Sequence, residues 1–276
     1  MTSYADIVQA LKDGEERHPE LADLIGLYCS LLEIQDEANL PAHQPTLTPV
    51  EAQGRLQRGE PLVSPDELDA DPAVLADLCA RIGFAIAERK RERVNELARI
   101  HAWFYERRER IGALAAEYLR SGHLSSGNGP GIDAGMLTFV FNAALRPFLR
   151  AQAQALAPLV EKAVWYRGYC PICGGEPDMA ALEKAGGQKR LICLRCDTEW
   201  TFHRLGCPFC GNEEAAQLAY YPSDDQVYRL NVCERCNRYL KTIDLRMAAA
   251  EHPLAAERVL TAGMDVAAEK AGYRGG

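Results

Sequence analysis

Long apolar segments are absent from this sequence. No apolar run approaches the roughly 18 residues that a membrane-spanning helix needs, and the first residues, from Met1 to Asp6, carry neither a basic segment nor an apolar one. These absences predict a soluble protein without an export signal, which we expect in the cytoplasm. In that reducing compartment, clustered cysteines bind metal or carry out redox chemistry more often than they form structural disulfides.

Catalytic motifs are also missing. The sequence shows no Ser/His/Asp constellation and no pair of carboxylates that stands out, and His101 and His123 are isolated. The glycine-rich residues 127–131 lack the lysine, the strand and the helix of a phosphate-binding loop. We therefore expect a protein that is not an enzyme.

Positive charge is scarce. The chain has 31 Lys and Arg against 39 Asp and Glu, and residues 1–165 hold 17 of the former and 24 of the latter. A protein that binds the phosphate backbone of nucleic acids normally carries a clear basic excess. The acidic balance therefore argues against a nucleic-acid-binding protein.

Paired cysteines, by contrast, are abundant. Eight of the 10 cysteines form four Cys-x-x-Cys pairs between residues 170 and 236, and the pairs repeat one pattern twice. A tetrahedral metal ion, with bonds of about 2.3 Å to sulfur, is held by four thiolates that converge from two tight turns. We predict two metal sites, the first made by Cys170, Cys173, Cys193 and Cys196 and the second by Cys207, Cys210, Cys233 and Cys236.

Two alternatives to this assignment remain open. Cys193 and Cys196 can share a metal with Cys207 and Cys210, or the cysteines can bind no metal and remain thiols or form disulfides. Four thiolates leave no open coordination position, so such sites are structural or carry electrons and are not hydrolytic. The sulfur ligands suit zinc and iron equally well.

The residue that follows each cysteine pair supports the predicted turns. Turns of this kind often need a positive φ directly after the second cysteine, and the residues there are Gly174, Asp197, Gly211 and Asn237. Glycine adopts that conformation freely, and Asp and Asn tolerate it best among the other residues. We also expect backbone amides of the turns to donate hydrogen bonds to the thiolates.

The other cysteines and a nearby histidine fit a structural role better than a metal-binding one. Cys29 and Cys79 each lie among apolar residues of helical spacing, so we expect both to be buried core thiols. His203 lies between two cysteine pairs, but four thiolates already complete each site, so we do not expect His203 to be a ligand.

Residues 1–165 are predicted to be helical, with two charged runs, 89–93 and 106–110, on solvated faces. The predicted features are a helix over 21–32, a connector with Pro41, Pro45 and Pro49, capping boxes at Thr48–Glu51 and Ser64–Glu67, a long helical stretch over 73–120, a hinge over 122–135 and a helix over 136–165, kinked at Pro147.

Residues 166–246 instead alternate short strands with turns, and a C-terminal helix is expected over 253–273. The fold class is thus a mainly α N-terminal domain followed by small metal-bound β modules of the zinc-ribbon or rubredoxin-like kind. The predicted strands are 190–193, 198–203, 227–230 and 240–243, and the predicted domains are 1–165 (helical), 166–205 and 206–246 (the two four-cysteine modules) and 247–276 (the C-terminal helix and tail).

The sequence resembles the formate dehydrogenase accessory protein family, often called FdhE. The motifs that carry the resemblance span most of the chain and include all eight paired cysteines. They are Arg17-His-Pro-Glu-Leu-Ala-Asp-Leu-Ile-Gly-Leu-Tyr28, Asn142-Ala-Ala-Leu-Arg-Pro-Phe-Leu149, Trp165-Tyr-Arg-Gly-Tyr-Cys-Pro-Ile-Cys-Gly174, Cys193-Leu-Arg-Cys-Asp-Thr-Glu-Trp200, Cys207-Pro-Phe-Cys210 and Cys233-Glu-Arg-Cys-Asn-Arg-Tyr-Leu-Lys-Thr242.

This resemblance implies a cytoplasmic assembly factor, or maturation chaperone, that contacts the immature catalytic subunit of formate dehydrogenase. It also implies two rubredoxin-like modules and favours iron as the metal, with zinc as the alternative. Two other functions are kept as hypotheses: a rubredoxin-like electron carrier that acts on the client enzyme, and a nucleic-acid-binding zinc ribbon. The acidic charge balance disfavours the ribbon.

Overall fold

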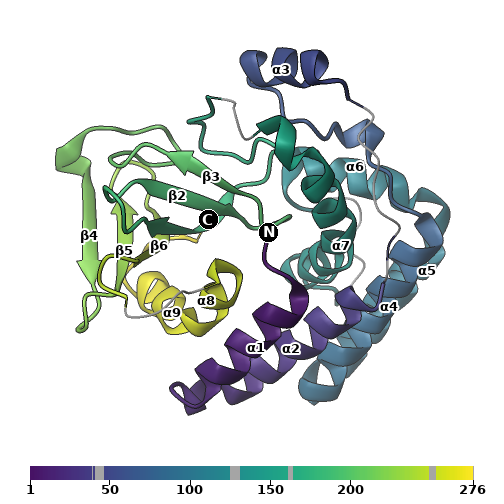
Figure 1. Cartoon of the computed structure of the whole chain (residues 1–276). Coiled ribbons are helices and arrows are strands. Elements are labelled where there is room, and N and C mark those ends of the chain that lie inside the picture. The colour runs from purple at the N-terminus through teal and green to yellow at the C-terminus, as the bar shows by residue number, and fades with distance from the viewer. Residues whose placement is uncertain (39, 41–46, 125–130, 161–163, 249–252, 276) are drawn as a thin grey trace.

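A computed structural model of the protein describes residues 1–38, 40, 47–124, 131–160, 164–248 and 253–275. In Figure 1 a group of helices stands on one side of the molecule and a twisted sheet on the other, and two C-terminal helices lie against the sheet. The helices that precede the sheet are α1 (Tyr4–Glu15), α2 (Ala22–Asp36), α3 (Pro49–Arg58), α4 (Pro72–Arg89), α5 (Val94–Glu106), α6 (Ile111–Ser121) and α7 (Ala134–Val160).

The capping prediction is confirmed at one site and wrong at the other. Before α3, the Thr48 hydroxyl accepts a hydrogen bond from the Glu51 amide, and the Glu51 carboxylate accepts one from the Thr48 amide at 2.8 Å. Ser64 makes no such side-chain cap, because the chain turns extended again at Leu68 after one 3₁₀ turn. Asp71 caps α4 instead, by accepting from the amides of Ala73 and Val74.

The long helical stretch over 73–120 is divided into α4, α5 and α6. The breaks fall in the two charged runs, at Lys90 and at Arg107, where 3₁₀ turns follow. These breaks let α4 pack against both α5 and α7, so that the apolar faces of the helices meet in one core. Most side chains of the charged runs stay exposed, as expected.

Within the described part of the chain, six strands form one continuous sheet, in the order β3-β2-β1-β6-β5-β4. The four predicted strands are present, and two more, β1 and β4, were missed. Strand β1 pairs in parallel with β6, in the register Met179 opposite Lys241, and this pairing joins the two cysteine repeats. The strands are β1 (Pro177–Leu182), β2 (Lys189–Cys193), β3 (Glu199–Phe202), β4 (Leu218–Pro222), β5 (Tyr228–Cys233) and β6 (Arg238–Asp244).

The predicted single C-terminal helix is wrong, because the residues described after the sheet form two helices. The chain leaves helical geometry at Thr261, which separates α8 (Leu254–Leu260) from α9 (Ala262–Lys270). The break lets α8 pack on α1, α2 and β1 while α9 packs on β6. The C-terminal helices thereby cover one face of the sheet, as Figure 1 shows.

Some predicted features end early or lie outside the described residues. Helix α7 contains Pro147 and ends at Val160, and Trp165 lies in no helix, so the predicted extension to residue 165 is wrong there. Pro41, Pro45 and residues 125–130 of the predicted hinge lie outside the described part of the chain. Among the described residues, no helix is both long enough and apolar enough to cross a membrane.

Candidate metal centres

The first four predicted cysteines lie together in the structure. Their sulfur atoms are 3.6 Å apart for Cys170 and Cys196, 3.5 Å for Cys173 and Cys193, and 3.4 Å for Cys173 and Cys196. A tetrahedron with metal–sulfur bonds of about 2.3 Å has sulfur–sulfur edges of about 3.8 Å. A disulfide needs about 2.05 Å. The first sulfur set, Site 1, therefore has the dimensions of a tetrahedral metal site and not of disulfides.

The second four cysteines form a similar set, Site 2. The sulfur atoms of Cys207 and Cys236 are 3.7 Å apart, as are those of Cys210 and Cys233. All four ligand atoms of each set lie within 4.8 Å of one another, so both sets can hold a metal ion. The structure groups the cysteines as the internal repeat indicates and does not bring Cys193 and Cys196 together with Cys207 and Cys210.

The turns after the cysteine pairs have the predicted backbone geometry. The φ values are +71° at Gly174, +56° at Asp197, +68° at Gly211 and +54° at Asn237. In Site 1, the Ile172 amide donates a hydrogen bond to the Cys170 sulfur at 3.4 Å. The Arg195 amide donates one to the Cys193 sulfur at 3.3 Å. These contacts stabilise negative charge on sulfur, which a thiolate ligand requires.

The two sets differ in exposure. In Site 1 no cysteine is more than 4% exposed, whereas in Site 2 Cys210 and Cys236 are partly exposed. Burial raises the pKa of Cys170 well above its usual value. Burial also acts on Cys233, but hydrogen bonds from the Cys236 backbone and the Asn212 side chain outweigh it and lower the pKa to about 7. Burial also raises the pKa of Cys207 in Site 2, so each site contains at least one sulfur that needs a nearby cation to stay ionised.

The remaining candidate residues lie apart from both sulfur sets. Cys29 and Cys79 are buried in the hydrophobic core, as predicted, at 7% and 2% exposure. His203 is exposed, and its ring stacks on Tyr166 at a centroid distance of 4.9 Å. Neither sulfur set includes His203.

Known proteins share this architecture. No family model matches the chain. A protein FdhE homologue from Aquifex aeolicus is 27% identical over 270 residues, which cover 94% of this chain and 88% of that protein. The crystal structure of the FdhE protein from Pseudomonas aeruginosa has the same fold, with a TM-score of 0.65 at 21% identity over 98% of this chain and 92% of that one. The chain is FdhE-like.

The likeness to a third relative is local. Protein FdhE from Escherichia coli K12 is 35% identical over 81 residues, which are 28% of this chain and 26% of that protein. The predicted fold class is confirmed for the FdhE-like chain, which has a helical N-terminal portion followed by a sheet region with two four-cysteine sets.

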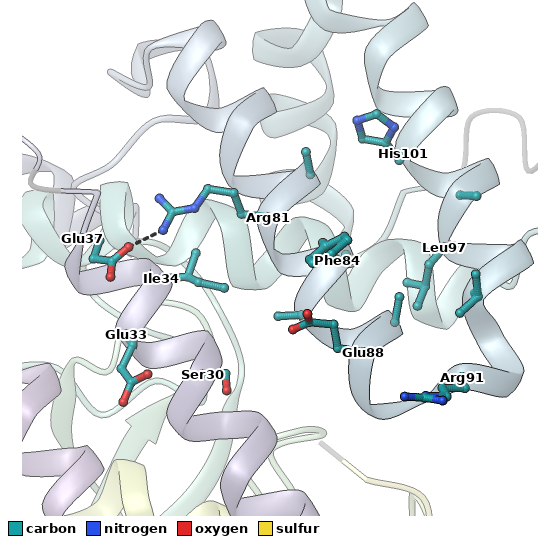
Figure 2. Close-up of a pocket in the computed structure, with 16 residues that line it drawn as sticks. Ser30, Glu33, Ile34, Glu37, Arg81, Phe84, Glu88, Arg91, Leu97 and His101 are labelled. Atoms are coloured by element: carbon teal, nitrogen blue, oxygen red, sulfur yellow. Dashed lines mark hydrogen bonds and ion pairs between the residues drawn. The ribbon is translucent and has the colours of Figure 1, made fainter.

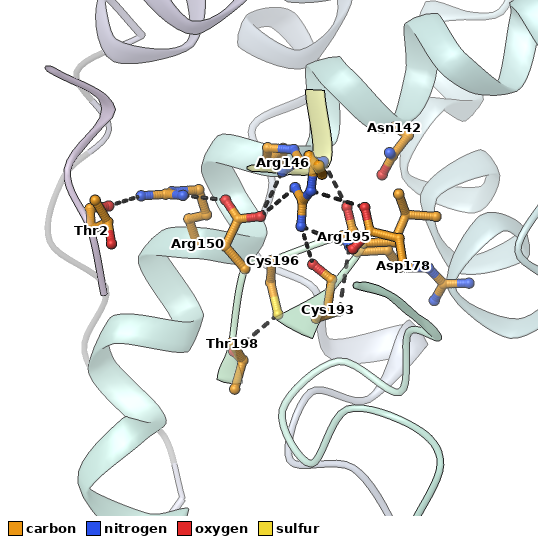
Figure 3. A network of polar contacts seen from close by, with 12 residues as sticks. Thr2, Asn142, Arg146, Arg150, Asp178, Cys193, Arg195, Cys196 and Thr198 are labelled. Carbon is orange, nitrogen blue, oxygen red and sulfur yellow. Dashed lines mark hydrogen bonds and ion pairs between the residues drawn. The ribbon is translucent and has the colours of Figure 1, made fainter. Parts of the chain in front are cut away.

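A buried ionic network ties Site 1 of the FdhE-like chain to its helices (Figure 3). Asp197 follows Cys196 directly, and its carboxylate accepts hydrogen bonds from Arg146 and Arg150 on α7 and from Arg258 on α8. Burial alone raises the pKa of Asp197, but the three arginines outweigh it and hold the pKa well below its usual range. Asp197 therefore remains ionised and links three elements that are distant in sequence.

Backbone contacts complete this network. Arg146 also donates to the Leu194 carbonyl at 2.6 Å, and Arg258 donates to the Cys193 carbonyl at 3.2 Å and to Asp178. Arg195, between the two cysteines of the turn, donates to the Leu119 carbonyl at 2.9 Å. A divalent ion with four thiolates at Site 1 would carry a net charge of minus two. Together with the charges of Asp178 and Asp197, this makes minus four, which the four positive charges of Arg146, Arg150, Arg195 and Arg258 balance. This role was not predicted from the sequence, although Arg146 lies in the Asn142–Leu149 motif.

The C-terminal tail holds the corresponding turn of Site 2. The Arg274 amide donates to the Asn237 carbonyl at 2.8 Å, and the Tyr239 amide donates to the Arg274 carbonyl. The Tyr273 hydroxyl donates to Glu234 at 2.6 Å. The C-terminal tail thus holds the second cysteine turn of Site 2 in place, as α7 and α8 hold the second cysteine turn of Site 1.

A separate groove lies between α2, α4 and α5 and has a volume of about 1260 Å³. Figure 2 shows Phe84 and His101 among its lining residues, with Glu37, directly after α2, paired to Arg81 of α4. Phe84 is 67% exposed, which is unusual for a large apolar side chain. None of the lining residues belongs to either sulfur set, so the groove is not part of the metal centres.

Proposed function

We propose that this protein is a non-enzymatic accessory factor for formate dehydrogenase, a maturation chaperone that binds the immature catalytic subunit in the cytoplasm. The observation that carries the proposal is the likeness to an FdhE homologue over 94% of the chain. The agreement in fold and the two complete cysteine sets support it. The acidic charge balance is consistent with a protein that handles another protein and not a nucleic acid.

We further propose that the eight cysteines are the ligands of two metal ions, with iron favoured by the family resemblance and zinc as the alternative. The sulfur–sulfur distances fit either ion, and four thiolates complete a tetrahedral shell. Zinc would only cross-link the two cysteine turns of a site. Iron would cross-link them as well and could also accept and donate one electron. The domain boundaries at residues 165, 205 and 246 remain a proposal, because one sheet contains both repeats.

The junction between the helices and the sheet is the proposed client-binding region. A cavity of about 580 Å³ lies there, with walls from α1, α2, α7, the sheet and both C-terminal helices. Its lining includes Arg146, Asp197 and Arg258, so the network next to Site 1 also shapes the cavity. Metal binding would then stabilise the surface that contacts the client.

A pull-down with the separately produced catalytic subunit tests the chaperone function. We expect the metal-loaded protein to retain the immature subunit, which lacks its cofactors, more strongly than the mature subunit. Arg108→Ala serves as the control, because Arg108 is exposed and lies in neither the cavity nor a cysteine turn. The proposal fails if the immature subunit is not retained and a deletion strain keeps full formate dehydrogenase activity.

The partial exposure of Site 2 favours a second candidate function, that of an electron carrier. Cys210 and Cys236 reach the surface, so electrons can pass to a partner over a short distance. This function requires iron that cycles reversibly between two oxidation states. Protein that is purified with stoichiometric zinc and still supports client maturation would exclude it.

A further inference from the structure

The cavity between the helices and the sheet holds charged residues that are paired with one another. It has a volume of about 580 Å³, and each of its three cations lies against a lining carboxylate. The pairs are Arg146 with Asp197, Arg258 with Asp178 and Lys241 with Asp265. The remaining charged lining residue, Glu269, is exposed, so solvent screens its charge. Among the described lining residues, no buried charge is therefore left to select an ion.

Gln35 places an uncharged acceptor in the wall of this cavity. The residue is 4% exposed, and its side-chain oxygen makes no hydrogen bond within the described part of the chain. The orientation of the amide is set by its nitrogen, which donates to the Ala143 carbonyl at 2.8 Å, a place where a second oxygen would only be repelled. A buried acceptor without a donor is unfavourable, so a ligand that donates a hydrogen bond to Gln35 removes this cost.

Two uncharged donors line the same cavity. The Asn142 side-chain oxygen accepts a hydrogen bond from the Tyr118 hydroxyl at 2.8 Å, which leaves the Asn142 nitrogen without an acceptor among the residues that the structure describes. The Tyr28 hydroxyl makes no hydrogen bond to a described residue either, although the charge of Arg146 acts on it electrostatically. Because Gln35 bonds to the residue after Asn142, the free acceptor and this free donor lie close together.

Apolar side chains form much of the remaining wall. They come from α1, α2, α7 and α8 and include Ile7, Leu31, Leu32, Phe139 and Val259. Pockets that bind ligands typically have volumes of about 300–1,000 Å³ and combine such apolar walls with a few polar groups. The cavity therefore has the size and the lining of a binding site for an apolar group that carries one uncharged polar function.

A primary carboxamide, the side-chain group of Asn and Gln, matches these polar groups. It carries an N–H and a C=O on one edge, so it can donate to the Gln35 oxygen and accept from the Asn142 nitrogen at once. A backbone peptide group has its N–H and C=O on opposite sides, because the peptide bond is trans. A carboxylate has no hydrogen to donate to Gln35, and an ammonium has no acceptor for Asn142. The cavity therefore favours a carboxamide over an ion or a backbone peptide group.

We propose that the cavity binds an uncharged, largely apolar segment of the immature client and recognises one Asn or Gln side chain in it, which donates to Gln35 and accepts from Asn142. The inference rests on the proposed accessory function and names the kind of client segment that is recognised. An apolar segment is accessible in an immature subunit and buried in a folded one, so this site would distinguish the two.

Saturation-transfer difference NMR with the full-length, metal-loaded protein tests the ligand class. The probe is the tripeptide leucine–glutamine–leucine with acetyl and methylamide caps, and its counterparts carry glutamate, lysine or methionine in the middle. We expect the glutamine peptide to bind at least five-fold more tightly than each counterpart, because only its side chain satisfies both the Gln35 oxygen and the Asn142 nitrogen.

Two variants change the polar groups while the fold is kept. Tyr28→Phe removes a hydroxyl that makes no hydrogen bond to a described residue, so it should leave the melting temperature unchanged and weaken the glutamine peptide about five-fold. Asn142→Asp keeps an acceptor for the Tyr118 hydroxyl but replaces the free donor, so it should weaken the glutamine peptide and strengthen the lysine peptide. The matched controls are Tyr105→Phe and Asn95→Asp, both exposed on α5 and outside the cavity.

The outcomes separate this inference from the accessory function, because the peptide assay contains no client. Equal affinity for the glutamine and glutamate peptides, or full binding by both Tyr28→Phe and Asn142→Asp, overturns the inference even where the pull-down retains the catalytic subunit. Peptide binding without retention of the subunit refutes the client as the source of the carboxamide and the accessory function with it. Displacement of the peptide by an equal concentration of acetamide would identify a small-amide site, which also refutes a client segment.

Discussion

Replacing Asp197 by asparagine should destabilise the protein strongly. The asparagine has the same shape and tolerates the φ of +56° at this position, so the backbone turn is preserved. The change removes one negative charge that is buried among Arg146, Arg150 and Arg258. Of these three arginines, Arg258 alone retains a described carboxylate partner, Asp178.

The size of the effect follows from burial. Asp197 and Arg150 have side-chain exposures of 4% each, and Arg258 of 8%, so solvent does not screen the charges. Removing one partner from a buried ion pair typically costs about 3–5 kcal/mol, because the remaining charge is left uncompensated. For a chain of this size, a loss of that order lowers the melting temperature by roughly 10 °C.

Thermal and urea unfolding, followed by circular dichroism at matched metal content, measure this effect. Asp224→Asn is the control, because Asp224 is exposed in the turn between β4 and β5 and should change the free energy of unfolding little. A loss below about 1 kcal/mol in Asp197→Asn would refute the reasoning. Arg150→Met should destabilise much less in the Asp197→Asn background than in the wild type, because the two residues belong to one network.

Three further predictions concern the metal centres and the pH dependence. In a chelator assay with the chromophore pyridylazoresorcinol, Site 2 should release its metal before Site 1, because Cys210 and Cys236 are partly exposed; simultaneous release would contradict this. Truncation after Gly272 should speed release from Site 2 alone, since Arg274 no longer holds Asn237. Because the arginines depress the pKa of Asp197 below its usual 3.8, its network should persist above pH 4 and fail only at lower pH, as acid unfolding of metal-free protein can measure.

Local features were predictable from sequence because the signals are local. The Thr48 cap, the positive φ after each cysteine pair and the grouping of the cysteines depend on residues a few positions apart or on an internal repeat. The predicted Ser64 cap is absent because the chain becomes extended after one turn. The residues next to Ser64 do not by themselves determine where this helical turn ends. Strand β1 was missed because its Ala180 and Ala181 have weak strand propensity and are buried in the middle of the sheet.

By itself, the sequence determined the helical first part, the two cysteine sets and the family resemblance, since each depends on residue types and spacings along the chain. Only the tertiary structure decided that β1 and β6 join both repeats in one sheet and that Asp197 gathers arginines from α7 and α8. It also decided that Site 1 is buried while Site 2 reaches the surface. The physical reason is that burial and charge pairing depend on which distant segments pack together, and Arg146, Asp197 and Arg258 become neighbours only in the folded chain.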